Sequence, residues 1–222
     1  MGTSVNHPHT SLSSRTFPGN TTALVYAGGL ASRMGGVNKA FVPVFGKPMI
    51  EHVVERLRSI GVARIVVSAN RDAERFEALG VTVLPDLRKD FPGALAALEA
   101  LAQSELEPTE RVFTCPCDAP FFPETLPLEL DEAARRAGAS GAFPRDAQGR
   151  AQSAFALFSW SVLSDAGAFL DEGGHRLGGV LRCSGLTVLP YEGDERRLAN
   201  LNSLEDVRAA EADPAFDLWM RP

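Results

Sequence analysis

A glycine-rich segment with two cationic residues stands near the start of the chain. The run Tyr26-Ala27-Gly28-Gly29 is followed by Arg33 and then by Lys39. Glycines allow the backbone to approach a ligand closely and to turn its N–H groups toward anionic oxygens. Arginine offers phosphate a forked donor, and lysine offers it a compact charge. The segment therefore predicts a phosphate cradle, with Arg33 and Lys39 on the β- and γ-phosphates of a nucleotide.

Two common phosphate-binding patterns do not fit this segment. The dinucleotide pattern G-x-G-x-x-G is absent, because Gly28 and Gly29 are adjacent and the third glycine comes too late. The P-loop requires Gly-Lys followed by Ser or Thr, whereas Gly46-Lys47 runs into Pro48. A tight turn would explain the glycines alone, but it would not explain the two cations that follow them.

Polar side chains close three further apolar runs. Ser68, Asp86 and Asp118 each end such a run or follow it within three residues. Because the carboxyl ends of parallel strands line one rim of a sheet, these side chains are expected to converge on the glycine segment. A carboxylate at that rim suits Mg²⁺, which takes one or two carboxylates together with phosphate oxygens and water. We therefore predict Asp118 as the metal ligand, although an aspartate at a strand end is also a common turn former.

The elements that must position these residues alternate between strand and helix. Apolar runs predict buried strands at 23–27, 64–68, 81–84 and 111–115. Helices are expected at 48–60, 72–79, 94–103 and 124–137. The looser second part predicts strands at 154–158 and 186–189, helices at 162–170 and 175–183, and a last helix capped by Ser203 and Asp206. The alternation indicates an α/β fold, a doubly wound, mostly parallel sheet of Rossmann-like type with helices on both faces.

The length and composition fit one domain with short tails. Residues 1–22 contain nine Ser or Thr and no acidic residue, which predicts a flexible N-terminal tail. A single domain is expected over 23–215, with a C-terminal tail at 216–222.

The net charge and the cysteine count argue against a nucleic-acid-binding protein and against a disulfide-stabilised one. Among 222 residues, 22 basic and 28 acidic side chains give a net charge of −6, so no nucleic acid is expected as a partner. No apolar run approaches the roughly 20 residues of a membrane span. Cys115, Cys117 and Cys183 are too few for a disulfide framework and are expected to be free thiols in a reducing, cytoplasmic setting.

The motifs together resemble the MobA-like nucleotidyltransferases over about residues 23–212. They stand in the order of that family: Ala27-Gly28-Gly29, Ser32-Arg33-Met34-Gly35, Lys39, Gly46-Lys47-Pro48, Ser68-Ala69-Asn70, Asp86, Phe91-Pro92-Gly93, Pro116-Cys117-Asp118-Ala119-Pro120 and Asn200-Leu201-Asn202. The resemblance implies a nucleotidyltransferase with GTP and Mg²⁺ as ligands and Mo-molybdopterin as acceptor. The expected reaction transfers GMP to that acceptor and releases pyrophosphate.

The resemblance also implies roles for single residues. Tyr26, Ala27 and Gly28 would approach the nucleotide through their backbones, and Lys39 would hold its phosphates. Asp86 would help to fix the nucleoside, and Asp118 would bind the metal. Ser68 stands where the family often has Asn, and Tyr26 where it often has Leu. Asn200 and Asn202 are further candidates for the metal or acceptor site.

Several alternatives remain open at this level. Cytidylyl-transferring relatives typically carry Ala where Gly28 or Gly29 stands, so the glycine pair favours guanylyl transfer. Two other functions are possible alternatives. The chain could be a sugar-1-phosphate nucleotidyltransferase, or a non-catalytic subunit that binds nucleotide and delivers the cofactor. The expected partners are small-molecule substrates and, transiently, molybdoenzymes or other cofactor-biosynthesis proteins, without nucleic acid or membrane. Arg176 and Arg182 would either meet the pterin phosphate or lie on a solvated helix face.

Overall fold

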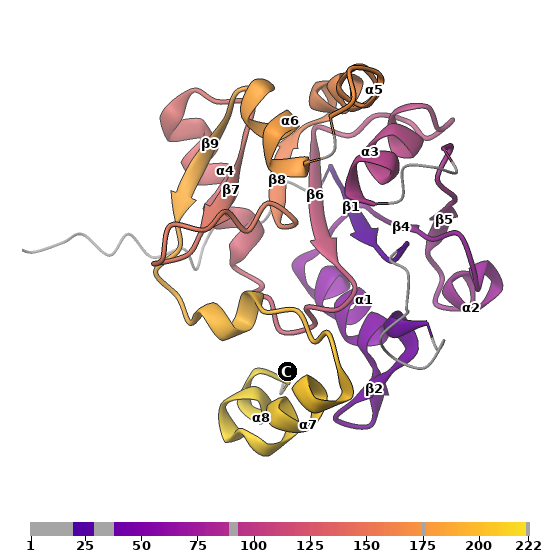
Figure 1. Ribbon diagram of the computed structural model, residues 1–222, viewed down its shortest axis with the longest axis vertical. Helices are drawn as coiled ribbons and strands as arrows, with labels where there is room; N and C mark the ends of the chain where they lie inside the picture. Colours follow the sequence, from indigo (N-terminus) through magenta and orange to yellow (C-terminus); the bar gives the residue numbers. More distant parts are fainter. Residues whose placement is uncertain (1–19, 29–37, 89–92, 175, 221–222) are drawn as a thin grey trace, which may run out of the picture.

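A central sheet of seven strands forms the core of the protein (Figure 1). The computed structural model describes residues 20–28, 38–88, 93–174 and 176–220. In spatial order the strands are β5 (Thr82–Leu84), β4 (Arg64–Ser68), β1 (Thr21–Tyr26), β6 (Arg111–Pro116), β8 (Ala156–Ser159), β7 (Gly141–Arg145) and β9 (Leu186–Pro190). All neighbouring pairs are parallel except those of β8 with β6 and β7. The mostly parallel sheet predicted from the sequence is confirmed.

Helices cover both faces of this sheet. The α-helices are α1 (Met49–Ile60), α2 (Ala73–Glu77), α3 (Ala94–Ala102), α4 (Leu126–Ala137), α5 (Ser164–Asp171), α6 (Leu177–Cys183), α7 (Leu204–Ala212) and α8 (Pro214–Met220). Short 3₁₀ helices lie at η2 (Lys39–Phe41), η3 (Trp160–Leu163) and η4 (Glu195–Leu198), and β2 (Pro43–Val44) pairs with β3 (Lys47–Pro48) as a hairpin. Buried side chains of α1 and α4 pack on one face, and those of α3, α5 and α6 pack on the other. The doubly wound α/β fold is therefore confirmed.

Strand β1 shows how the sequence produces this arrangement. Ala23 and Val25 point into the cluster that contains α1 and α4, whereas Leu24 points into the cluster that contains α3 and α5. All three are fully buried. A continuous apolar run is what a central strand covered on both faces requires. The strand therefore ends in the interior of the molecule, where its last residues can contact a bound ligand.

The structure extends the folded part beyond both expected boundaries. Strand β1 begins at Thr21, inside the predicted tail 1–22, and the rest of that tail lies outside the described residues. Residues 216–220, expected in a C-terminal tail, belong to α8. The Phe216 ring of this helix is 8% exposed, and its centroid lies 4.6 Å from that of Phe121 and 4.7 Å from that of Trp219. Burial of these aromatic rings fixes the end of the chain.

The cysteines behave as small buried thiols at the end of a strand. Cys115 and Cys117 are free and buried, as predicted, and Cys183 is free and exposed. Burial raises the pKa of Cys117 to about 12. At neutral pH this thiol is protonated and therefore poorly nucleophilic.

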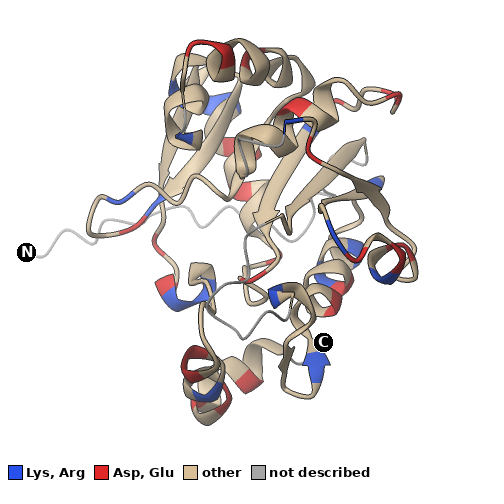
Figure 2. Cartoon of the chain, turned by 45° about the vertical axis from the view of Figure 1, so that its right-hand side comes forward, with Lys and Arg blue, Asp and Glu red and all other residues tan. Residues whose placement is uncertain are grey.

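The charged side chains are spread over many elements. Figure 2 shows basic and acidic residues interspersed on helices and loops across the described part of the chain. No helix within these ranges has the length and apolar character needed to cross a bilayer.

Candidate active site

The carboxyl ends of the parallel strands bring the predicted polar residues to one rim. Tyr26 at the end of β1 lies in register with Ser68 of β4 on one side and with Pro116 of β6 on the other. A cavity of about 240 Å³ opens there. Its lining includes Tyr26, Gly28, Ser68, Asp118 and Asn200. The rim expected from the strand pattern therefore encloses a ligand-sized space.

The backbone after β1 continues the sheet into this cavity. The Ala27 N–H donates to the Ser68 carbonyl at 3.0 Å, and the Cys117 N–H donates to the Tyr26 carbonyl at 3.0 Å. At Gly28 an added Cβ would lie 3.6 Å from Oδ2 of Asp86, so the backbone passes close to that carboxylate. Gly29 and Arg33, predicted to bind phosphates, lie outside the described residues.

The Tyr26 side chain belongs to the core. It packs against the cluster formed with α3 and α5, and burial raises the pKa of its hydroxyl. Nucleotide binding through the Tyr26 backbone stays a prediction, because the Tyr26 carbonyl already accepts the Cys117 N–H.

Lys39 meets Asp118 across 79 positions of sequence. Lys39 starts the short helix η2, whose N-cap Asn38 accepts a hydrogen bond from the Ala40 N–H at 3.2 Å. Its ammonium group forms an ion pair with the Asp118 carboxylate. The same Nζ donates to Oδ1 of Asn202 at 2.8 Å. The two charged residues predicted from separate motifs are therefore in direct contact, with side chains only 18% and 14% exposed.

The loop that carries Asp118 is held through its carbonyl groups. The Leu201 N–H donates to the Asp118 carbonyl at 2.8 Å. Two arginines from other elements hold the next residues of the loop. Nε of Arg56 in α1 donates to the Pro120 carbonyl at 3.2 Å, and Nε of Arg197 in η4 donates to the Phe121 carbonyl at 3.0 Å. Burial lowers the pKa of both guanidinium groups. Partly buried charged donors at fixed carbonyl acceptors give the loop a defined position.

Asn202 is held in turn by the first turn of α7. The backbone N–H groups of Asn202 and Ser203 donate to Oδ2 of Asp206 at 2.7 and 2.8 Å. The Ser203 hydroxyl accepts the Asp206 N–H at 3.1 Å, which completes a capping box. The sequence predicted the cap, but it gave no sign that Asp206 supports a residue of the site.

Asp86 sits in a small hydrogen-bonded frame. Its Oδ1 accepts the Ser68 hydroxyl at 3.0 Å, and its Oδ2 accepts the Asn70 amide at 2.8 Å. The Asp86 N–H donates a hydrogen bond to Oδ1 of Asn70 at 2.8 Å. Each carboxylate oxygen keeps a lone pair for a ligand donor. Asn70 stands in the Ser68-Ala69-Asn70 motif, and its contact with Asp86 is a role that the sequence alone did not assign.

The donor set around Asp118 fits a hard cation that also binds substrate. Within the described residues no three His, Cys, Asp or Glu side chains gather as a metal site. Asp118 contributes one carboxylate, and the Asn202 amide oxygen contacts the same lysine nitrogen. A single carboxylate next to Lys39 could hold Mg²⁺, which usually takes its remaining ligands from phosphates and water.

Comparison with known proteins agrees with this arrangement. Residues 23–184 match the family model described as a MobA-like NTP transferase domain. The chain belongs to this family. A molybdenum cofactor guanylyltransferase of Cupriavidus taiwanensis is 36% identical to it over 197 residues, which cover 87% of this chain and 97% of the relative. The enzyme of the same name from Ralstonia pickettii is 36% identical over 194 residues, with 84% and 93% covered.

A solved structure shares the fold of this MobA-like chain. The molybdopterin-guanine dinucleotide biosynthesis protein A of Archaeoglobus fulgidus superposes with a TM-score of 0.67 at 20% identity, covering 86% of this chain and 96% of that one. Membership of the family makes the protein a nucleotidyltransferase.

Proposed function

We propose that this MobA-like enzyme transfers GMP from GTP to Mo-molybdopterin, forming Mo-molybdopterin guanine dinucleotide and releasing pyrophosphate. The contact among Lys39, Asp118 and Asn202 at the rim of the sheet is the observation that carries the proposal. The names of the relatives support a guanylyl donor and the molybdenum cofactor as its acceptor.

The reaction is a displacement at phosphorus. An oxygen of the terminal phosphate of Mo-molybdopterin forms a bond to the α-phosphorus of GTP, and the bond from that phosphorus to the β-phosphate oxygen breaks. Pyrophosphate leaves with the electron pair. Because the nucleophile is already an anion, no strong general base is needed. The protein must align the two phosphates and neutralise their charge.

The predicted site residues divide this task. Lys39 holds the phosphates of GTP together with Arg33, and the backbone of Tyr26, Ala27 and Gly28, with Gly29, approaches the nucleotide. Asp86 accepts donors of the nucleoside, and its orientation is fixed by Ser68 and Asn70. A carboxylate held by two donors loses little further freedom when a ligand binds.

Asp118 is the residue that would hold Mg²⁺, with the Asn202 oxygen nearby. When bound, the ion neutralises phosphate charge and polarises the bonds at phosphorus. Asp118 is held in place by the Leu201, Arg56 and Arg197 contacts of its loop. We also propose that the enzyme works in the cytoplasm and contacts molybdoenzymes or other cofactor-biosynthesis proteins transiently.

Release of pyrophosphate from each of the four nucleoside triphosphates, with and without Mo-molybdopterin, tests the proposal. We expect release only with GTP, Mg²⁺ and Mo-molybdopterin together, and loss of at least about 10²-fold in kcat for Asp118→Ala. Preference for CTP would identify a cytidylyltransferase, and release with a sugar 1-phosphate in place of the pterin would identify a different acceptor. Tight GTP binding without turnover would indicate a delivery subunit.

A further inference from the structure

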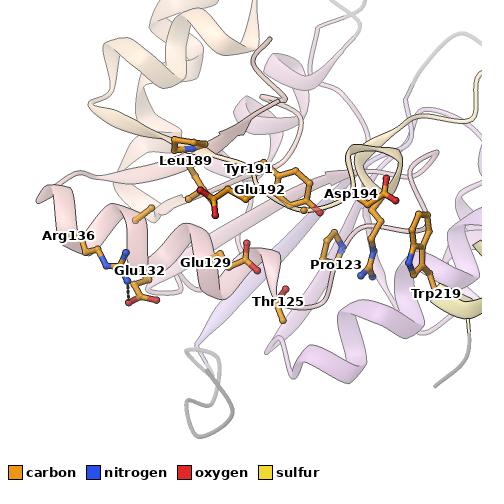
Figure 3. A pocket seen from close by; sticks show the side chains of 14 residues that line it. Pro123, Thr125, Glu129, Glu132, Arg136, Leu189, Tyr191, Glu192, Asp194 and Trp219 are labelled. Atoms are coloured by element: carbon orange, nitrogen blue, oxygen red, sulfur yellow. Dashed lines mark hydrogen bonds and ion pairs between the residues drawn. The ribbon is translucent and has the colours of Figure 1, made fainter. Parts of the chain in front are cut away.

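A second hollow, here called the α4 groove, runs along helix α4 (Figure 3). It has a volume of about 680 Å³, and none of its lining residues lines the nucleotide cavity. One wall is α4, and the other is the segment that follows β9. Strand β9 is the last strand of the sheet, so this groove lies at a sheet edge. Of its side chains, the proposed reaction uses only Arg197, which holds the loop that carries Asp118.

The two walls of the α4 groove carry carboxylates that face the same space. Glu132 pairs with Arg136, and Asp194 pairs with Arg196 at 2.9 Å. Within the described ranges the side chains of Glu129 on α4 and Glu192 on the opposite wall form no ion pair or hydrogen bond, and Glu129 lies near enough to Arg197 to interact with its charge. The Glu129 side chain is half-buried. A partly desolvated carboxylate with no partner attracts a cation more strongly than a fully exposed one does.

The side chain of Tyr191, largely buried, lines the same space. Tyr191 is 8% exposed, and its hydroxyl makes no hydrogen bond within the described part of the chain. Figure 3 shows its ring between the two walls, with the hydroxyl directed along the groove. Burial raises the pKa of Tyr191 to about 12, so the hydroxyl stays protonated at neutral pH. A Cβ at Gly193 would lie 2.4 Å from this oxygen, so any larger residue there would clash with the hydroxyl.

One end of the groove is closed by a cation and an aromatic ring. Nε of Arg197 donates to the Phe121 carbonyl at 3.0 Å, and its guanidinium carbon lies 5.4 Å from the centre of the Trp219 ring. A second cation is therefore unfavourable at that end, and a ligand's positive charge belongs in the section between Glu129 and Glu192.

The length of the groove indicates an extended ligand. Its lining reaches from Trp219 to Arg136 along the 12 residues of α4, a helix of about 18 Å. An extended peptide of five or six residues has about that length. Leu189 of β9 and the Trp219 ring add apolar contact area, which a small polyamine would leave unused.

We propose that the α4 groove is a docking surface for an extended segment of a partner protein, with a lysine or arginine side chain of that segment between Glu129 and Glu192. The cationic group donates to both carboxylates and to the Tyr191 oxygen, and the neighbouring apolar residues of the segment lie against Leu189 and Trp219. Charge complementarity selects a basic segment over an acidic one.

Fluorescence anisotropy tests the docking surface on the full chain. The probe is a fluorescein-labelled hexapeptide of alternating valine and lysine, and its partner peptide carries glutamate in place of lysine. We expect binding of the lysine peptide only, weakening as salt rises. The double variant Glu129→Gln/Glu192→Gln should bind it at least about 10-fold more weakly, and Tyr191→Phe should also weaken binding.

A matched variant separates local from overall charge. Glu105→Gln/Glu205→Gln removes the same two charges at exposed positions outside the groove, and it should change the affinity by less than about twofold. Pyrophosphate release by Glu129→Gln/Glu192→Gln should equal that of the unmodified enzyme, which shows that the variant is folded. Three results would each overturn the proposal. The lysine peptide could fail to bind at 10⁻³ M, or both double variants could lose affinity equally. Spermidine could also displace the labelled peptide fully at the same concentration as unlabelled peptide does.

Discussion

The carboxylate of Asp206 supports the loop that carries Asn202, and Asp206→Ala removes that support without touching the cavity. Two backbone donors, the N–H groups of Asn202 and Ser203, lose their acceptor at 2.7 and 2.8 Å. Asn202 in turn is the residue whose side chain accepts Nζ of Lys39 at 2.8 Å. We therefore expect a small loss of stability and a larger loss of activity.

The structure gives a magnitude for each loss. Removing a capping acceptor costs about 1 kcal/mol of unfolding free energy. For a chain of this size that lowers Tm by about 2–4 °C, which differential scanning calorimetry resolves. A charge-assisted hydrogen bond is worth about 1.5–3 kcal/mol, and the Lys39–Asn202 contact is partly exposed, so we take the lower end. Its loss predicts a fall of about tenfold in kcat/KM for GTP in the pyrophosphate-release assay.

Ser203→Ala is the matched control for this experiment. It removes the Ser203 hydroxyl that accepts the Asp206 N–H, but it leaves the Asp206 carboxylate on Asn202. The control should lose similar stability and keep nearly full activity. Equal activity of Asp206→Ala and Ser203→Ala at equal loss of Tm would refute the reasoning, because the loop would then not depend on Asp206.

Three further substitutions probe other parts of the structure. Gly28→Val places a Cβ 3.6 Å from Oδ2 of Asp86 and a side chain in the cavity, so KM for GTP should rise about tenfold with Tm unchanged. An unchanged KM would refute the close approach of the Gly28 backbone to the nucleotide. Phe121→Ala removes a fully buried ring beside Phe216 and should lower the free energy of unfolding by about 3–5 kcal/mol, which lowers Tm by about 10 °C. A fall in Tm below about 3 °C would contradict the place of Phe121 in the aromatic cluster. Burial lowers the pKa of His52, so the unfolded chain takes up the proton first and stability falls as pH drops below about 6.5. Urea midpoints measured between pH 7 and pH 5 should fall less for His52→Asn than for the unmodified chain. An equal fall in both proteins would show that protonation of His52 does not cause the loss of stability.

The sequence predicts the parallel strands well because their signal is local. The fully buried strands β1 and β4 appear as continuous apolar runs, and the run at residues 64–68 matches β4 at both ends. Polar residues after these runs could be assigned to one rim by topology alone. The meeting of Lys39 with Asp118 follows from that rim, although the ion pair itself required coordinates.

The features that were missed depend on contacts between distant parts of the chain. Helix α8 is seven residues long, and its Phe216 is held by Phe121, 95 positions earlier. The local pattern gave no reason to separate such a segment from a tail. The frame around Asp86 depends likewise on the pairing of β4 with β5, which brings Asn70 beside it.

The supporting role of Asp206 was hidden for a different reason. Its capping pattern with Ser203 is complete in the sequence and explains the residue fully as a helix start. The contact of Asn202 with Lys39, 163 positions away, connects that cap to the site, and the local sequence gives no sign of it.

A double-mutant cycle on GTP binding tests the central claim most directly, namely that Lys39 and Asp118 act at one metal–nucleotide site. Isothermal titration calorimetry would compare the unmodified chain, Lys39→Met, Asp118→Asn and the double variant, each with and without Mg²⁺. We predict that Asp118→Asn abolishes the effect of Mg²⁺ on GTP affinity, that Lys39→Met weakens GTP in both conditions, and that the two changes are coupled by more than about 0.5 kcal/mol. Unchanged affinities in the single variants, or strictly additive changes with the Mg²⁺ effect intact in Asp118→Asn, would contradict the account.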